Sequence, residues 1–152
     1  MISAEMTSRG ILGMRKRDFF RLFKKSLAYL GKRWHTRFRK RHFSQSAYTL
    51  YSYTPRKRAY NRAKLKYLGH TRPLEKSGAA KRQSGSKKVT ATRKGVTVKM
   101  PIRVANLRAK NSRINMRKEI TTVINSEESA LERDTVLDFE KRLNRFRQNR
   151  RF

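Results

Sequence analysis

The stretch from Tyr48 to Gly78, YTLYSYTPRKRAYNRAKLKYLGHTRPLEKSG, decides how the rest of the chain is arranged. An aromatic run leads through Thr54 and Pro55 into a basic segment that stops at Gly69. Threonine is a good N-cap, proline suits the first helical position, and glycine suits the left-handed residue after the last turn. We therefore predict a short middle helix that begins after Thr54 and ends at Gly69.

The middle helix is expected to have one packing face on an otherwise basic surface. Tyr60, Ala63 and Tyr67 recur three and four residues apart, which places them on the same side of the helix. Because that side is largely aromatic, we predict that it packs against the rest of the molecule. The basic residues of this segment, which are candidates for contact with a polyanion or an acidic partner, are Arg56, Lys57, Arg58, Arg62, Lys64 and Lys66.

A long basic amphipathic helix is predicted from Arg15 to Lys40. Large apolar residues recur there at helical spacing, which favours a core role, and they are Phe19, Phe23, Leu27, Leu30, Trp34 and Phe38. The other sides of the helix carry further candidates for polyanion or partner contact, namely Arg21, Lys24, Lys25, Lys32, Arg33 and Arg37. No apolar run reaches the roughly 20 residues of a membrane span, and we expect no membrane partner.

After Gly78 the apolar residues change from a helical period to a period of two. The polar segment 79–88 is expected to be a loop. Apolar residues then alternate on both sides of a turn at 93–95 and predict a β-hairpin; they are Val89, Ala91, Val96, Val98, Met100 and Ile102. The basic, irregular segment 104–116 is expected to be a second loop. The segment 118–124, KEITTVI, is rich in β-branched residues and predicts a third strand.

A second long helix is predicted at the C-terminal end, from Ser126 to Arg147. Asn125 and Glu128 resemble a capping box at its start. Asp138 and Arg142 lie four apart and form a usable ion pair. Its apolar stripe is expected to comprise Val136, Phe139, Leu143 and Phe146.

Together these patterns predict an α+β fold. Its parts are a long basic amphipathic N-terminal helix, a short middle helix, a small antiparallel sheet with a hairpin, and a C-terminal helix. We expect one domain over residues 15–147, a flexible arm over residues 1–14 and a tail over residues 148–152. Residues 41–53 fit either a helical turn or a short extended piece, and the pattern does not decide between them.

The charge of the chain indicates an anionic or acidic partner. Lys and Arg number 41 against 10 Asp and Glu, which gives a formal charge of +31 over 152 residues. Self-repulsion at this density opposes a compact isolated chain. Before residue 119 the only acids are Glu5, Asp18 and Glu75, so the basic surface belongs to the first two thirds of the sequence.

The residue patterns of common catalytic and metal sites are missing. The chain has no cysteine, and His35, His42 and His70 are not spaced as metal ligands. We expect His42 to pack near the end of the first helix and His70 to form a hydrogen bond in its turn. Neither a phosphate-binding Gly-x4-Gly-Lys-Ser/Thr loop nor a nucleophile elbow is present. We predict a protein that is not an enzyme, with no metal, no cofactor and no small-molecule substrate.

A series of residues from the first helix through the middle of the chain carries a family resemblance. They are His42-Phe43, Tyr51, Tyr53, Pro55-Arg56, Tyr60, Lys64, Gly69-His70, Pro73-Leu74 and Ser77-Gly78. This series resembles small bacteriophage virion morphogenesis proteins of the tail-completion, neck or tail-terminator class. The likeness continues more weakly through the hairpin near Gly95 and through residues 119–121. Together with Trp34, the residues that we expect to pack or to define the motif are His42, Tyr53, Pro55, Tyr60, Tyr67, Gly69, His70, Pro73 and Leu74.

The resemblance implies a structural virion protein of a tailed phage, assembled in the host cytoplasm. Its copies would form a homo-oligomeric ring at the head–tail junction. Adjacent portal or connector proteins and tail proteins would be its partners, with nonspecific contact to packaged DNA. The alternative is a ribosomal or other rRNA-binding scaffold protein, which the size, the charge and the basic segments also fit. The acid-balanced C-terminal helix favours the protein assembly.

Overall fold

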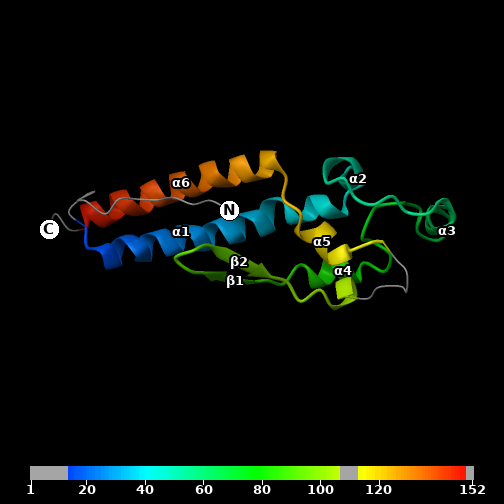
Figure 1. Ribbon diagram of the computed structural model, residues 1–152, viewed down its shortest axis with the longest axis horizontal. Helices are drawn as coiled ribbons and strands as arrows, with labels where there is room; N and C mark the ends of the chain where they lie inside the picture. The colour runs from blue at the N-terminus through cyan, green and yellow to red at the C-terminus, as the bar shows by residue number, and fades with distance from the viewer. Residues whose placement is uncertain (1–13, 107–112, 150–152) are drawn as a thin grey trace.

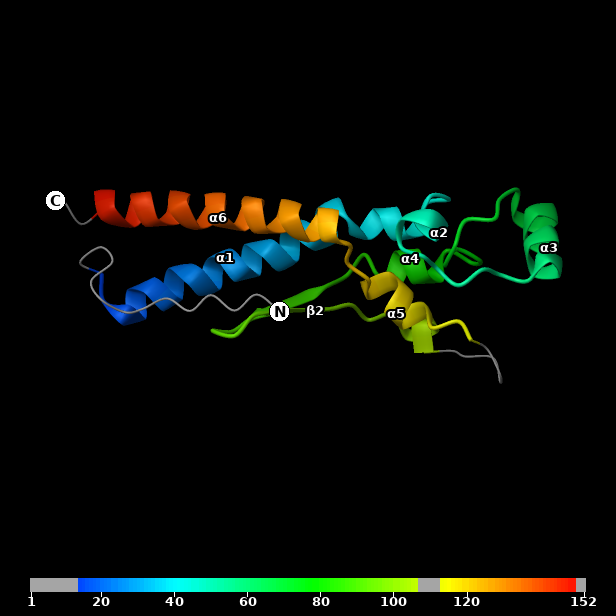
Figure 2. The ribbon, with the colours of Figure 1, turned by 45° about the horizontal axis from the view of Figure 1, so that its top comes forward.

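The computed structural model describes residues 14–106 and 113–149 (Figure 1). The long helices α1, Lys16–Arg37, and α6, Asn125–Gln148, run antiparallel and side by side. A hairpin of β1, Lys88–Ala91, and β2, Val96–Lys99, packs on the other side of α1, so α1 lies in the middle (Figures 1 and 2). The shorter elements are the 3-10 turns η2, Arg39–Phe43, and η3, Arg103–Asn106, and the helices α2, Ala47–Leu50, α3, Arg58–Leu68, α4, Ala79–Gln83, and α5, Met116–Thr121.

The α+β fold is confirmed, including both long helices, a short middle helix and an antiparallel hairpin. The predicted arm, apart from Met14, and the last three residues of the predicted tail lie outside the described residues. Residues 41–53, which the sequence left undecided, form the end of η2, the short helix α2 and connecting turns.

The apolar stripe of α1 has the predicted core role, and its packing partners, which the sequence did not identify, are α6 and the hairpin. Trp34 and Phe38 are buried against Leu131 of α6. Nearer the other end, the rings of Phe19 and Phe23 meet the ring of Phe139 edge-on, at centroid distances of 5.5 and 6.3 Å. This seam holds the two long helices together.

The hairpin lies close to α1 because α1 has a glycine at the contact. A Cβ atom placed on Gly31 would approach the side chains of Val89, Val96 and Val98 to 2.9–3.0 Å, which is too close for unstrained packing. In the pairing of the two strands Val89 is opposite Val98. The second strand ends at Lys99, so the predicted alternation through Met100 and Ile102 is too long.

A second core lies beyond the end of α1, where short segments from distant parts of the sequence meet. Its buried members are Phe43, Ala47, Tyr51, Tyr53, Leu74, Ala80, Ala105 and Ile120. Two predictions for this region are wrong. The expected loop after Gly78 contains α4, because Ala79 and Ala80 are good helix formers and Ala80 is buried.

The predicted third strand is also helical, in α5. The side chain of Asn115 caps its first turn by accepting a hydrogen bond from the backbone N–H of Lys118 at 3.0 Å. Helical spacing then buries Glu119 and Ile120 together. Only residues 122–124 are not helical in this segment, so the β-branched composition was overridden by tertiary packing.

Two predicted helix starts are displaced. The middle helix begins at Arg58, and the residue before it, Lys57, makes no side-chain cap. The chain is not helical from Thr54 to Lys57, where Arg56 reaches away to a distant carboxylate. Helix α6 begins at Asn125 itself, so Asn125 is not its N-cap.

The predicted apolar stripe of α6 is correct only in part. Phe139, Leu143 and Phe146 are half-buried, but Val136 is 56% exposed. Leu131, which the prediction omitted, is the buried contact of α6. The ion pair of Asp138 with Arg142 is present at 2.6 Å.

Candidate functional site

The residues that define the sequence motif meet in a buried cluster of aromatic and charged side chains. We call this cluster the polar-aromatic core; its members are His42, Tyr51, Tyr53, Arg56, Glu119 and Glu127. The imidazole of His42 stacks on the ring of Tyr51 at a centroid distance of 4.0 Å, and Tyr51 stacks on Tyr53 at 5.7 Å. The stacked rings join the end of η2 to the turn after α2, and hydrogen bonds from Tyr51 and Tyr53 connect them to Glu127 of α6 and to Glu119 of α5.

Hydrogen bonds define the protonation of His42. The hydroxyl of Tyr53 donates its only proton to the backbone carbonyl of Glu119 at 2.7 Å. The Nδ1–H of His42 must therefore be the donor in its 2.5 Å bond to that hydroxyl. The Nε2 atom is buried and has no hydrogen-bond partner among the described residues, so it carries no proton. Burial lowers the pKa of His42 to about 4, which keeps the ring neutral.

Arg56 and Glu119 form a buried bidentate ion pair. The two Nη atoms of Arg56 donate to the two carboxylate oxygens of Glu119 at 2.9 and 2.6 Å, and the side chains are only 7% and 8% exposed. Arg56 also donates to the backbone carbonyl of Thr54 at 2.6 Å. Such a fork fixes both position and orientation. Arg56 is therefore a structural residue here, and not part of the basic surface on which the sequence placed it.

Glu127 connects helix α6 to the rest of the polar-aromatic core. It is fully buried in the first turn of α6 and accepts a hydrogen bond from the hydroxyl of Tyr51 at 2.5 Å. Arg41 lies 3.7 Å from the same carboxylate oxygen. Burial, followed by the hydrogen bond and the charge of Glu127, raises the pKa of the Tyr51 hydroxyl. Sequence reasoning did not identify this long-range contact of Glu127.

The turn after α3 agrees in most respects with the motif. Gly69 has φ +67°, the left-handed conformation expected after the last helical turn. Pro73 is fully buried and Leu74 is buried in the second core. Pro55 is exposed and lies before the helix rather than in its first turn. The Nδ1 atom of His70 is buried without a hydrogen-bond partner among the described residues, contrary to the expected bond.

Helix α3 does not pack through its predicted aromatic stripe. Tyr60 is 40% exposed, Tyr67 is 77% exposed, and Ala63 is exposed as well. The one buried residue of this helix is Lys64, whose ammonium donates to the backbone carbonyl of Arg72. Burial lowers the pKa of Lys64. In Figures 1 and 2 the helix projects at one end of the long axis.

The candidate basic residues divide into those used inside the chain and those that are free. Arg21 lies 3.4 Å from Asp18, and Arg33 and Arg37 lie 2.8 and 3.2 Å from Asp134. The hydrogen bond from Arg33 is the main reason why the pKa of Asp134 is lowered. The candidates that are exposed and have no carboxylate partner among the described residues are Lys24, Lys25 and Lys32 on α1 and Lys57, Arg58, Arg62 and Lys66 at α3. The exposed lysines and arginine of the hairpin, which sequence reasoning did not single out, are Lys88, Arg93, Lys94 and Lys99.

Among residues 14–106 and 113–149, the carboxylates without partners are all on one helix. Within the described residues, Asp18, Glu75, Glu119, Glu127, Asp134 and Asp138 are each in an ion pair. Glu128, Glu132 and Glu140 of α6 have no ion pair or hydrogen bond in that part of the chain and are exposed. The acid-rich composition of the C-terminal region indicated a charged helix, but it could not distinguish these acids from the paired ones.

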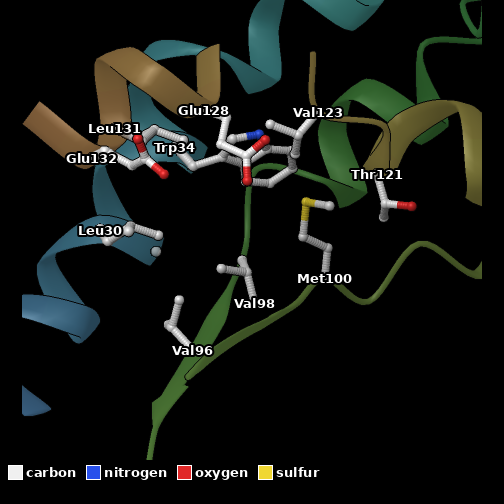
Figure 3. Close-up of a pocket in the computed structure, with 11 residues that line it drawn as sticks. Leu30, Trp34, Val96, Val98, Met100, Thr121, Val123, Glu128, Leu131 and Glu132 are labelled. Atoms are coloured by element: carbon white, nitrogen blue, oxygen red, sulfur yellow. The ribbon is translucent and has the colours of Figure 1, made fainter. Parts of the chain in front are cut away.

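An apolar groove of about 370 Å³ opens beside two of these free carboxylates (Figure 3). Its lining residues come from α1, the hairpin and its continuation, α5, the residues after α5, and α6; they are Leu30, Gly31, Trp34, Val96, Val98, Met100, Thr121, Val123, Glu128, Leu131 and Glu132. In Figure 3 the carboxylates of Glu128 and Glu132 lie along one side of the groove, and Val98 and Met100 lie on the other. The groove therefore combines an apolar floor with an acidic rim. We call it the α1–α6 groove.

Within residues 14–106 and 113–149, no group of three or more His, Asp or Glu side chains is placed to bind a metal ion. No helix in that part of the chain is long and apolar enough to cross a bilayer. Comparison of the sequence and structure with protein-family models, curated proteins and solved structures gives no match. The resemblance to phage morphogenesis proteins thus rests on the residues quoted from the sequence.

Proposed function

We propose that this chain is a non-enzymatic structural subunit of a tailed-phage virion, of the neck or tail-completion class. Copies of it would form a ring at the head–tail junction, next to portal or connector proteins and tail proteins. The observation that supports this proposal best is that the residues of the sequence motif have structural roles. The side chains of His42, Tyr53 and Arg56 are buried in one core, and a largely exposed helix, α3, follows Arg56 in the chain.

The polar-aromatic core fits a structural role better than a catalytic one. Its ion pair, Arg56 with Glu119, is almost completely shielded from solvent, and each carboxylate oxygen of Glu119 already accepts a hydrogen bond from Arg56. His42 is fully buried and neutral. A substrate would have no access to these groups without unfolding the core. A buried, fully hydrogen-bonded ion pair of this kind suits a subunit that must present fixed surfaces to several neighbours.

The free basic residues favour a second candidate, an rRNA-binding scaffold protein. Lys57, Arg58, Arg62 and Lys66 are exposed around α3 and have no carboxylate partner in the described chain. If about eight basic residues neutralised phosphates of duplex nucleic acid, log affinity would fall against log salt with a slope of roughly −7. In a phage neck the same residues would make only nonspecific contact with packaged DNA, because DNA must slide through the channel.

The experiment that separates the two candidates is purification at high salt with nuclease treatment. Light scattering would then give the mass in solution, and negative-stain microscopy would show the shape. A closed ring free of nucleic acid is the result expected of the virion subunit. A monomer that gains order only when RNA is added would overturn the proposal and support the scaffold protein.

A further inference from the structure

Helix α3 has an exposed apolar ridge beside two arginines. Leu65 is 55% exposed and Leu68 is 39% exposed, and their spacing of three places them on one side of the helix. Arg62 lies three residues before Leu65, and Arg58 lies seven before it, so both arginines border the same side. Covering this apolar side would gain free energy, which makes it a candidate surface for a partner.

The α1–α6 groove has the complementary properties. Leu30, Trp34 and Leu131 contribute apolar surface, and Glu128 and Glu132 supply unpaired negative charge at its rim. Glu128 and Glu132 are four residues apart on α6, as Arg58 and Arg62 are on α3. At a rise of about 1.5 Å per residue, each pair is separated by roughly 6 Å along its helix. Two arginines can therefore face two glutamates while leucines enter the groove.

The chain cannot make this contact with itself. Figures 1 and 2 place α3 at the end of the long axis, whereas the groove lies between α1, the hairpin and the start of α6. Residues 69–78 and the buried Lys64 tie α3 to its own turn. A helix with matching apolar surface and charge must therefore come from another molecule. Every other copy of this chain has such a helix, its own α3.

We propose that α3 of one copy docks into the α1–α6 groove of the next copy. In this contact Leu65 and Leu68 enter the groove, and Arg58 and Arg62 pair with Glu128 and Glu132. The two surfaces are different, so each copy can bind one neighbour through its helix and another through its groove. Such a head-to-tail contact closes into a ring when the rotation between copies allows it and otherwise gives a filament. The inference deepens the proposed function by naming the contact between subunits.

Charge reversal tests the contact, with light scattering at about physiological salt as the measurement. Arg58→Glu with Arg62→Glu reverses the helix, and Glu128→Lys with Glu132→Lys reverses the groove. Each variant alone places like charges opposite each other, and we expect self-association to weaken at least about tenfold. Mixing the two variants in equal amounts makes both kinds of contact complementary, and the oligomer should reappear. A chain that carries all four changes should also assemble.

Matched controls use the same charge changes at sites away from both surfaces. Lys24→Glu changes an exposed lysine of α1, and Glu140→Lys changes an unpaired glutamate of α6 that does not line the groove. Both should assemble as the unchanged protein does. Far-ultraviolet circular dichroism would establish that every variant is folded, so that loss of assembly reports the contact.

The outcomes separate this inference from the proposed function. If the unchanged chain forms closed rings that neither reversal weakens, the α3–groove contact is wrong and the ring proposal stands. If it forms filaments that the reversals dissolve and mixing restores, the contact is right and the ring proposal fails. A chain that remains monomeric at every salt concentration overturns both. Oligomers weakened by each reversal but not restored by mixing would overturn the direct pairing of the two surfaces.

Discussion

One continuous stretch of sequence supplies the tyrosines of the polar-aromatic core and those of helix α3, but the two pairs of tyrosines are held differently. Tyr51 and Tyr53 are nearly inaccessible to solvent, because Glu127 and the backbone of Glu119 accept their hydrogen bonds. Tyr60 and Tyr67 lie on α3 and remain largely exposed. The difference teaches that helical spacing identifies an apolar face, whereas distant residues decide whether that face is covered within the chain.

The largest effect is expected from breaking the ion pair of the polar-aromatic core. Arg56→Ala leaves the carboxylate of Glu119 buried without a partner, which costs about 3–5 kcal/mol of unfolding free energy. Urea denaturation followed by circular dichroism would measure this loss. The double variant Arg56→Met with Glu119→Leu removes both charges and should recover most of it. A loss below about 1 kcal/mol in the single variant would show that the pair is not the main tie in this region.

A smaller effect is expected from the pH dependence of His42. Its pKa is about 4 in the folded chain and 6.5 when it is unperturbed, so between these values the unfolded chain binds a proton that the folded chain does not. Stability therefore falls as the pH is lowered through this range. Between about pH 7 and about pH 5 the contribution of His42 is roughly 2 kcal/mol.

The variant His42→Asn isolates that contribution, because asparagine keeps a donor for the hydroxyl of Tyr53 but does not titrate. The quantity to compare is the slope of unfolding free energy against pH, which should be shallower in the variant. The pKa of His35 is also lowered by burial, and its contribution remains in both proteins. Equal slopes would mean that His42 is accessible to protons in the folded chain.

The sequence predicted the periodic elements well and the contacts between them poorly. The stripe of α1, the hairpin pairing and the left-handed Gly69 all follow from local spacing and backbone preference. Helix α5, in contrast, is held in place by a bond between Arg56 and Glu119, which are 63 residues apart. Local β propensity carries no information about such a partner. The unpaired glutamates at the α1–α6 groove could likewise be identified only after the ion pairs of the other carboxylates were known.

A smaller change in stability is expected where α1 contacts the hairpin, because two opposing effects partly cancel there. Gly31→Ala gains about 1 kcal/mol of helix propensity. The new methyl group meets the side chains of Val89, Val96 and Val98 at 2.9–3.0 Å, and overpacking of this kind costs about 1–3 kcal/mol. The net result is a loss of about 1 kcal/mol, measured by thermal unfolding. Gly69→Ala would not serve as a control, because its φ is positive, but Ser86→Ala in the exposed segment before β1 would. Increased stability of Gly31→Ala would mean that the hairpin can move away from α1.

The smallest effect is expected where the sequence alone predicted a large one. If Tyr60 and Tyr67 formed a packing stripe, replacing them with alanine would loosen the middle of the chain. Because Tyr67 is 77% exposed, Tyr67→Ala should change the unfolding free energy by no more than about 0.5 kcal/mol. Tyr53→Ala is the matched comparison, since it removes a buried ring together with its two hydrogen bonds, and it should cost about 3–5 kcal/mol. The comparison must use the monomer, at a concentration where light scattering shows no self-association. If Tyr67→Ala proved as damaging as Tyr53→Ala under those conditions, α3 would be packed inside its own chain, and its ridge would not be free to bind a neighbour.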